Sequence, residues 1–349
     1  MTATTGRDAL RGRVQTVLGP ISPDDLGPTL MHEHLVCDIR QPSMRGPEDL
    51  GPELALDNVW AINYGTLEAA RNYVLDDVDV AVDELGLMRA AGGRAVVELS
   101  SGGLSPDPLA LRRIAERAGV HVVMGCGQYV HAFQDKGNGS RTVDDFAREM
   151  VDAVLVGAWG TPVRAGIIGE IGCQAPWTEQ EQRVMRAALI AQRETGAAVN
   201  VHPGRHPDQP QEIADLVRAA GGAIERVIVS HIDRTIFDTA RLLRLADTGC
   251  VLEFDLFGQE QSYYRHADID MPNDAVRLGM IRTLFDRGHG DRVVVSHDIC
   301  YRSRLSRFGG HGYGHIFANV VPMMRRRGFD EREVRMLTLD NPRRLLTIA

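Results

Sequence analysis

Short runs of apolar residues, each ending in a polar or small residue, recur along the whole chain. Runs of this kind are typical of strands that are buried on both faces, although their length alone does not exclude a buried helix. Eight segments have this pattern: TLMHEHL (29–35), AVVELS (95–100), VHVVMGCGQ (120–128), AGIIGEIG (165–172), AAVNVHP (197–203), RVIVSHID (226–233), CVLEFDL (250–256) and RVVVSHD (292–298). The pattern therefore predicts eight buried strands.

The stretches between these runs have helical periodicity, most clearly in residues 178–196. Thr178 and Glu181 have the spacing of a capping box, and Gly196 is a helix stop signal. Strands that alternate with helices form a parallel sheet, because each helix returns the chain across the sheet face. Eight such units predict an α/β fold of the (β/α)₈ TIM-barrel type. An open doubly wound sheet is the alternative, but the segment MHEHLVCD lacks the glycine-rich phosphate loop of that fold.

No low-complexity linker divides the chain, so we expect residues 1–349 to form a single barrel domain. Residues 1–12 are expected to be a flexible N-terminal segment. Two stretches, about 40–94 and about 256–291, are longer than a bare barrel needs. We expect helices and loops there that cover the top of the barrel.

Residues at the C-terminal ends of barrel strands point into the active site. Here they are four histidines and two carboxylates: His32, His34, Glu170, His202, His231 and Asp298. His32 and His34 share one side of a strand, so both can bind one ion. Glu170 has apolar neighbours, where a carboxylate is costly to bury unless it is paired or ligated. Any one of the histidines alone is better explained as a structural residue, and Glu170 alone could equally belong to a structural ion pair, but together the six suit two metal ions with a shared bridge.

Charge and composition indicate which partners the protein binds and where in the cell it is located. The formal net charge of −8 disfavours nucleic acid as the main partner, so we expect a small-molecule substrate. The five cysteines are scattered and form no CxxC pair, which favours free thiols in a reducing cytoplasm. The N-terminal residues include no apolar signal run, and no stretch approaches 18 apolar residues, so we expect neither secretion nor a membrane span.

The motifs resemble the phosphotriesterase-related proteins, the glutamate-bridged branch of the phosphotriesterase family in the amidohydrolase superfamily. The segments that carry the resemblance cover nearly the whole chain: VQTVLGPISPDDLGPTLMHEHL, GIIGEIGC, HPGR, SHIDRT, LEFDLFG, DIDMP, HDI and GGHGYGH. The resemblance implies that His32, His34 and Asp298 bind the more buried of two divalent ions. It further implies that His202 and His231 bind the exposed ion, that Glu170 and a hydroxide bridge the two, and that the protein is a homodimer.

Organophosphate-degrading members of the family use a carboxylated lysine as the bridge, whereas this chain has Glu170 there, and its single lysine, Lys136, lies in a polar loop. Animal members of the glutamate-bridged branch resemble N-acyl amide hydrolases. The site then predicts a hydrolase in which the bridging hydroxide attacks a carbonyl and Asp298 transfers the proton to the leaving group.

The expected substrate is a small anionic amide of the N-acyl amino acid or N-acyltaurine type. The alternatives are a lactonase or carboxylesterase with weak phosphotriesterase activity, and a non-catalytic metal-binding barrel. The histidine and carboxylate ligands suit zinc, although manganese, cobalt, nickel or iron would also fit.

Three further residues are candidates for substrate binding. Arg205 follows the fifth run and Arg302 follows the eighth, and an arginine fork binds carboxylate, sulfonate or phosphate through two parallel hydrogen bonds. The alternative for each arginine is an ion pair between loops. Tyr129 follows the third run and could donate a hydrogen bond to the substrate, or only form the pocket wall.

Two acidic residues are candidates for orienting a metal-binding histidine, because such histidines usually have a hydrogen-bonded partner behind them. They are Asp233, in the motif SHIDR, and Asp255, at the end of the seventh run. For Asp233 the alternative is a salt bridge to Arg234 or Arg226.

Overall fold

The computed structural model describes residues 6–46 and 50–349 of the chain. Its centre is a set of parallel strands, one inside each of the eight predicted runs. They are β3 (Thr29–Glu33), β6 (Ala95–Glu98), β7 (His121–Met124), β8 (Ile168–Gly172), β9 (Val199–His202), β10 (Val227–Val229), β11 (Val251–Phe254) and β12 (Val293–Val295). All eight predicted strands are confirmed, and so is the predicted (β/α)₈ barrel class.

The strands pair in two parallel arcs, β3-β6-β7 and β8-β9-β10-β11-β12. Individual hydrogen bonds join the ends of the arcs. Between β12 and β3, the Ser296 hydroxyl accepts from the His32 amide at 2.9 Å and donates to the His32 carbonyl at 2.7 Å. Between β7 and β8, the Gly166 amide donates to the Met124 carbonyl at 2.9 Å. The Ser296 contacts join the last strand of the barrel to the first, and the Gly166 contact joins the two arcs at their other ends.

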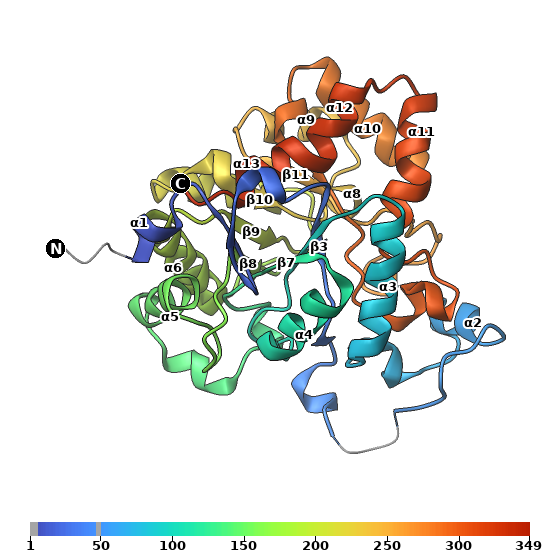
Figure 1. The fold of residues 1–349 in the computed structure, drawn as a ribbon, viewed down its shortest axis with the longest axis horizontal. Helices are drawn as coiled ribbons and strands as arrows, with labels where there is room; N and C mark the ends of the chain where they lie inside the picture. Colours follow the sequence, from blue (N-terminus) through green and yellow to red (C-terminus); the bar gives the residue numbers. More distant parts are fainter. Residues whose placement is uncertain (1–5, 47–49) are drawn as a thin grey trace.

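Helices surround the strands (Figure 1). They are α3 (Val78–Ala90), α4 (Pro108–Ala118), α5 (Val143–Leu155), α6 (Glu179–Thr195), α7 (Gln209–Ala219), α8 (Ile232–Thr235), α9 (Thr239–Ala246), α10 (Asp274–Asp286), α11 (Val321–Arg326), α12 (Glu331–Arg335) and α13 (Asn341–Leu346). Two short antiparallel pairs, β1 (Val14–Thr16) with β2 (Gly19–Ile21) and β4 (Cys37–Asp38) with β5 (Val74–Leu75), lie outside the arcs. No helix in the described part of the chain is both long enough and apolar enough to cross a membrane.

The predicted helix over residues 178–196 is α6, and its ends are those that the sequence indicates. Thr178 and Glu181 form a reciprocal capping box, which satisfies two free amides at the helix start. Gly196 ends the helix in the left-handed conformation, with φ of 77°. A Cβ atom at Gly196 would lie 2.4 Å from the backbone oxygen of Ala349. The C-terminus therefore leaves no room for a side chain at this position.

The barrel interior is apolar at its N-terminal end. Ala95 belongs to the interior cluster, whereas the next residue, Val96, packs in the layer shared with the helices, as strand alternation requires. Leu345 and Leu346 of α13 complete the interior cluster. Arg226, just before β10, donates to the Leu345 carbonyl, which places α13 under the start of the strands.

The upper half of the barrel is polar, although it is fully buried. Asn200 donates to the Glu253 carboxylate at 2.7 Å, and the His297 amide donates to the Glu33 carboxylate at 3.0 Å. Buried polar groups are tolerated when they are hydrogen-bonded in this way. The C-terminal ends of the strands therefore rest on a connected polar layer that can support charged groups.

The N-terminal segment differs from the flexible residues 1–12 that we expected. Residues 1–5 lie outside the described residues, but Gly6–Leu10 form the short helix α1. The Leu10 side chain is buried, and the Gly12 amide donates to the Ile348 carbonyl at 2.9 Å. This part of the segment therefore packs against the C-terminal end of the chain.

The two long stretches contain helices and loops, as predicted. Residues 40–94 include α2 (Val59–Asn63) and α3, and residues 256–291 include α10. Tyr73 from the first stretch, and Tyr264 and His266 from the second, line the same cavity as Glu170 and Asp298. Both stretches therefore cover the C-terminal end of the barrel.

Candidate metal centre

The six side chains predicted to bind metal lie together at the C-terminal ends of the strands. His32, Glu170 and His202 lie on β3, β8 and β9, while His34, His231 and Asp298 come shortly after β3, β10 and β12. Glu170 is at the centre of the group. Its Oε2 atom lies 2.6 Å from Nδ1 of His202 and 3.1 Å from Nε2 of His231. The same oxygen lies 3.6 Å from Nε2 of His32.

Asp298 closes the other side of the group. Its Oδ1 atom lies 3.2 Å from Nε2 of His34 and 3.7 Å from Nε2 of His32. Within the six residues, two sets have donor atoms within 4.8 Å of one another, namely His32, His34 and Asp298, and His32, Glu170 and His231. His202 lies beside these sets, because its Nδ1 atom faces Nε2 of His231 at 2.9 Å.

The chemistry of this group fits a cation. Nε2 of His32 is buried and makes no hydrogen bond within the described residues, although it faces the carboxylates of Glu170 and Asp298. A buried nitrogen without a partner is costly, and a cation between these atoms would remove that cost. The clustered imidazoles and carboxylates could therefore bind metal, and nitrogen and oxygen ligands of this type suit several divalent ions.

Two of these residues have an unusual backbone conformation. His231 has φ of 55° and Asp298 has φ of 51°, in the left-handed region that residues other than glycine rarely adopt. Local hydrogen bonds hold both in place. The His231 amide donates to Asp255 at 2.9 Å, and the Asp298 amide donates to the His32 carbonyl at 3.1 Å. Strained residues of this kind cluster at functional sites, where surrounding contacts fix them.

Asp255 lies behind two of the histidines. Its Oδ2 atom is 2.9 Å from Nδ1 of His32, and its Oδ1 atom is 3.0 Å from Nδ1 of His231. In both rings the opposite nitrogen, Nε2, then faces Glu170. This is the contact expected of a side chain that orients a metal-binding histidine.

Sequence reasoning missed a similar partner for His34. Nδ1 of His34 lies 3.0 Å from the Ser100 hydroxyl, which in turn bonds to the buried Glu98 carboxylate. Ser100 is the polar residue that ends the second predicted run, so the strand-end pattern that revealed the histidines could also have indicated it.

The structure corrects the prediction for Asp233. Among the described residues, its carboxylate forms no ion pair with Arg234 or Arg226 and no hydrogen bond to a predicted metal-binding histidine. Its Oδ2 atom instead accepts from Nε of Arg277 on α10 at 2.7 Å, with both side chains fully buried. Burial raises the pKa of Asp233 to about 6, even though Arg277 acts in the opposite direction.

Burial and neighbouring charges set the protonation of the group. Burial alone would raise the pKa of Glu170, but His202 and His32 outweigh it and hold that pKa well below its usual range. Burial lowers the pKa of His202 to about 3, despite the opposing effect of Glu170. For His32, burial is outweighed by Glu170 and Asp255, which raise its pKa well above the ordinary value. Because a metal-binding histidine must be neutral, cations and protons compete for this group.

A cavity of about 400 Å³ opens above the six residues. Tyr129 and Arg205, both predicted to contact substrate, line it. The Tyr129 ring packs edge-on against the ring of His202, with centroids 4.9 Å apart. Arg205 is exposed at the cavity, and its Nε atom donates to the Tyr264 hydroxyl at 3.0 Å. Both residues are therefore placed where they could meet a substrate.

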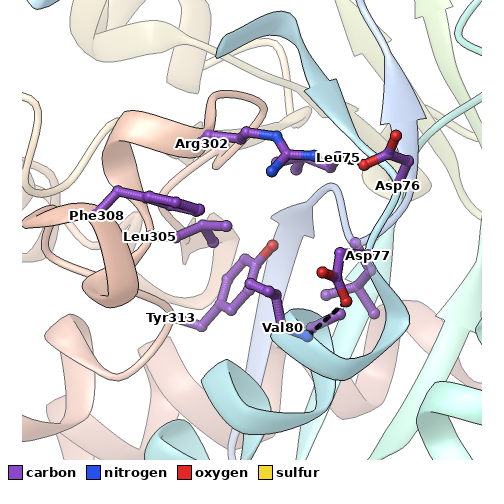
Figure 2. Close-up of a pocket in the computed structure, with 10 residues that line it drawn as sticks. Leu75, Asp76, Asp77, Val80, Arg302, Leu305, Phe308 and Tyr313 are labelled. Atoms are coloured by element: carbon purple, nitrogen blue, oxygen red, sulfur yellow. Dashed lines mark hydrogen bonds and ion pairs between the residues drawn. The ribbon is translucent and has the colours of Figure 1, made fainter. Parts of the chain in front are cut away.

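The prediction that Arg302 binds substrate is wrong. This residue does not line this cavity but a smaller one, shown in Figure 2, where its guanidinium points toward Asp76. Its Nε atom donates to the Val74 carbonyl at 2.7 Å, and Nη2 forms a close ion pair with Asp76. The alternative reading, an ion pair between loops, is therefore the observed one, because the segment after β5 lies beside the loop that follows β12.

Arg234 is a cavity residue that sequence reasoning weighed only as a partner of Asp233. Its side chain is buried, with 3 % of its surface exposed, and it lines the cavity beside His202. Its Nη2 atom lies 3.3 Å from Nε2 of His202 and donates to the Pro203 carbonyl at 3.1 Å. The residue after Asp233 thus turns into the cavity, while Asp233 itself turns away.

Comparison with known proteins gives a consistent result over nearly the whole chain. The sequence profile of the phosphotriesterase family matches residues 12–346. The N-acetyltaurine hydrolase of Xenopus tropicalis is 42 % identical over 346 residues, which cover 97 % of this chain and 99 % of that protein.

Two crystal structures have the same fold. A resiniferatoxin-binding protein from Rhodobacter sphaeroides superimposes with a TM-score of 0.92 and 32 % identity, covering 99 % of both chains. The phosphotriesterase homology protein from Escherichia coli, in complex with phosphate in its active site, has a TM-score of 0.77 and 29 % identity. That match covers 93 % of this chain and 99 % of the other.

Proposed function

Because the chain belongs to the phosphotriesterase family and is a hydrolase, we propose that it is a binuclear metal-dependent enzyme that cleaves a small anionic amide. The substrate we propose is of the N-acyltaurine or N-acyl amino acid type. The observation that carries the proposal is the convergence of three imidazoles on the Glu170 carboxylate beneath an open cavity. The name of the Xenopus tropicalis relative supports the choice of an N-acyltaurine.

The site residues would divide between two ions. His32, His34 and Asp298 would bind the more buried ion, and His202 and His231 the one nearer the cavity. Glu170 would bridge them, since its Oε2 atom faces a histidine of each set. We propose zinc, because tetrahedral nitrogen and oxygen sets are typical of it, with manganese, cobalt, nickel and iron as the other candidates.

The bound ions would supply two effects, a lower pKa for an attacking water and polarisation of the substrate carbonyl. Asp298 would accept the proton of that water and deliver it to the departing amine. Burial alone would raise the pKa of Asp298, but His34 and His32 outweigh burial and lower that pKa. The carboxylate is therefore ionised at neutral pH and free to accept a proton. An amine leaving group requires this proton, whereas an activated phenolate does not, so Asp298 should matter more for amides than for aryl esters.

Tyr129 would act as a hydrogen-bond donor on the cavity wall. Burial, reinforced by the nearby Glu170, raises the pKa of its hydroxyl well above the usual value, so the group stays protonated at neutral pH. Because the Tyr129 ring packs against His202 and lines the cavity, its protonated hydroxyl could donate to the oxygen of the substrate carbonyl as negative charge develops there.

The first test combines elemental analysis with a substrate panel. The purified protein would be assayed for metal before and after chelation, together with turnover of N-acetyltaurine, N-acetyl amino acids, lactones, aryl esters and a phosphotriester. We expect about two metal ions per chain, from the six ligands. Amide hydrolysis should be lost on chelation and restored by added metal.

Each other outcome has a definite meaning. Turnover of lactones or esters alone would overturn the amide proposal and favour a lactonase or carboxylesterase that uses the same residues. Metal binding without turnover of any substrate would favour a non-catalytic binding protein, in line with the name of the Rhodobacter sphaeroides neighbour. Absence of metal and of metal-dependent turnover would overturn the metal centre itself. A homodimer and a cytoplasmic location remain predictions.

A further inference from the structure

The cavity wall has an excess of positive groups. Three arginines line the cavity: Arg40, Arg205 and Arg234. Glu170 and Asp298 are the carboxylates in the same lining, and both are assigned above to metal binding. Once these carboxylates neutralise cations, the remaining charged side chains of the wall are guanidiniums. The wall is therefore complementary to an anion.

The three arginines differ in whether a carboxylate already neutralises them. Arg40 is paired with Asp38 through two parallel bonds, of 3.0 Å from Nε and 2.7 Å from Nη2. Neither Arg205 nor Arg234 forms an ion pair with any described acidic residue. Arg205 donates instead to the Tyr264 hydroxyl, and the bonds of Arg234 go to the neutral acceptors Pro203, His202 and Thr235. A buried guanidinium without a counter-ion is unfavourable, and Arg234 is almost fully buried.

The contact between Arg234 and His202 depends on which ring nitrogen carries the proton. A guanidinium can only donate, so Nε2 of His202 must be the acceptor in this contact. If Nδ1 of a neutral His202 binds a metal ion, the ring proton is on Nε2, which can then no longer accept from Arg234. Metal loading would therefore leave an Arg234 donor without its acceptor, on a side chain that lines the cavity.

We infer that Arg234, with Arg205 at the exposed side of the cavity, binds the acidic group of the substrate and thereby selects anionic over neutral amides. This inference rests on the proposed amidase function and deepens it. Arg234 lies on the opposite side of the His202 ring from Glu170. The acidic group must therefore be separated from the scissile carbonyl by only a few bonds, as in an N-acyltaurine.

The two guanidiniums also favour one type of anion. A sulfonate has three acceptor oxygens in a tetrahedral arrangement, so it can accept from Arg234 and Arg205 at the same time. A carboxylate has two oxygens in one plane, which suit a single arginine fork. The pair of arginines therefore predicts that a sulfonate binds more tightly than a carboxylate on a spacer of the same length.

The test compares N-acetyltaurine with its neutral analogue N-(2-methylsulfonylethyl)acetamide in the metal-loaded enzyme. In Arg234→Met, we expect kcat/KM for N-acetyltaurine to fall by about 10- to 100-fold, the effect typical of a lost charge-assisted hydrogen bond. The value for the neutral analogue should stay within about 3-fold. Arg234→Lys keeps the charge but not the fork, so it should recover part of the loss.

A matched control variant is Arg40→Met, which removes a guanidinium of the same wall that Asp38 already neutralises. It should change kcat/KM for both amides by the same factor. Thermal melting of each variant checks folding, and Arg205→Met provides a second variant if Arg234→Met does not fold. Equal effects of Arg234→Met on the charged and neutral amides would overturn the inference.

Binding of propane-1-sulfonate, measured by calorimetry, gives a readout that needs no catalysis. We expect binding to the wild type, and at least 10-fold weaker binding to Arg234→Met. Binding that Arg234→Met leaves unchanged would overturn the subsite. If no amide is hydrolysed but the sulfonate binds through Arg234, the proposed function fails and the subsite stands. If both amides are hydrolysed equally well by wild type and variant, the subsite fails and the amidase function stands.

Discussion

The carboxylate of Asp255 lies 2.9 Å from Nδ1 of His32, so the opposite nitrogen of this buried ring faces Glu170 and Asp298. The second oxygen of Asp255 makes the equivalent contact with His231. One carboxylate thus contacts two rings that come from different parts of the chain, His32 on β3 and His231 after β10.

Replacement of Asp255 by asparagine should weaken metal binding without unfolding the protein. The amide retains the size of the side chain but removes the charge that fixes the two rings, and a loss of 10- to 100-fold in metal affinity is typical of such a change. Competition with a chromophoric chelator measures this affinity. Asp76→Asn is the matched control, because Asp76 pairs with Arg302 away from the site. Equal affinities in all three proteins would contradict the role of Asp255.

Glu170→Gln should fold but lose most activity and bound metal. The amide has nearly the same shape, yet it removes the negative charge that lies within 3.6 Å of three imidazoles. Elemental analysis and turnover of N-acetyltaurine test this, and circular dichroism reports the fold. Unchanged metal content and turnover would exclude Glu170 as the bridge.

Metal should stabilise the protein more at pH 8 than at pH 6. For His32 and His231, burial is outweighed by Glu170 and Asp255 respectively, so both pKa values are raised. Protonation of these two rings therefore stabilises the folded metal-free protein. This stabilisation is complete below about pH 6.5, and it is lost as the pH rises through the pKa values of the folded state. Metal binding has the opposite dependence, since it requires neutral rings.

Differential scanning fluorimetry with and without zinc at both pH values measures this difference. A ligand at 100 times its Kd stabilises by about 2.7 kcal/mol. The increase in Tm caused by zinc should therefore be larger at pH 8. Identical melting curves with and without zinc would argue against a metal centre, and a larger increase at pH 6 would contradict the protonation states described above.

Arg277→Met should destabilise the fold by about 3–5 kcal/mol, the typical cost of removing one partner of a buried ion pair. The Arg277 side chain is fully buried and bonds to Asp233 and Asp274 at 2.7 and 2.9 Å. Asp274 also pairs with His315, so the variant leaves chiefly the buried Asp233 carboxylate without its cation. Urea denaturation measures the loss. Arg282→Met, on the same helix but partly exposed, is the control and should cost less than about 1 kcal/mol. Similar losses in the two variants would contradict this reasoning.

Gly196→Ala should cost more stability than Gly328→Ala. Both glycines are left-handed, with φ of 77° and 85°, where an alanine costs roughly 1–2 kcal/mol. At Gly196 the new Cβ atom would also meet the Ala349 backbone at 2.4 Å, whereas nothing lies within 4 Å at Gly328. Thermal or urea unfolding of the pair isolates this additional contact. Equal losses would mean that the C-terminus moves away without cost.

Much of the site could be predicted because it depends on strand ends. His202 ends one strand and His231 follows another, the apolar runs of both strands are visible in the sequence, and parallel strands bring their C-terminal ends to one face. Ser100 could have been found by the same rule. The contacts of Arg302 could not be predicted, because this residue begins a single 3-10 turn (Arg302–Arg304) and its partner Asp76 lies more than 200 residues away in the chain.

The sequence by itself determined the eight strands, the ends of α6, and the six side chains that meet beneath the cavity, because local periodicity and strand ends are enough to place them. Only the tertiary structure decided that Asp233 pairs with Arg277 and that Arg234 turns toward His202. These two neighbours lie on one short helix, and the ion pair with Arg277 of α10 holds Asp233 away from the cavity that Arg234 lines. Side chains on loops and short helices take their direction from such distant contacts, which no local pattern encodes.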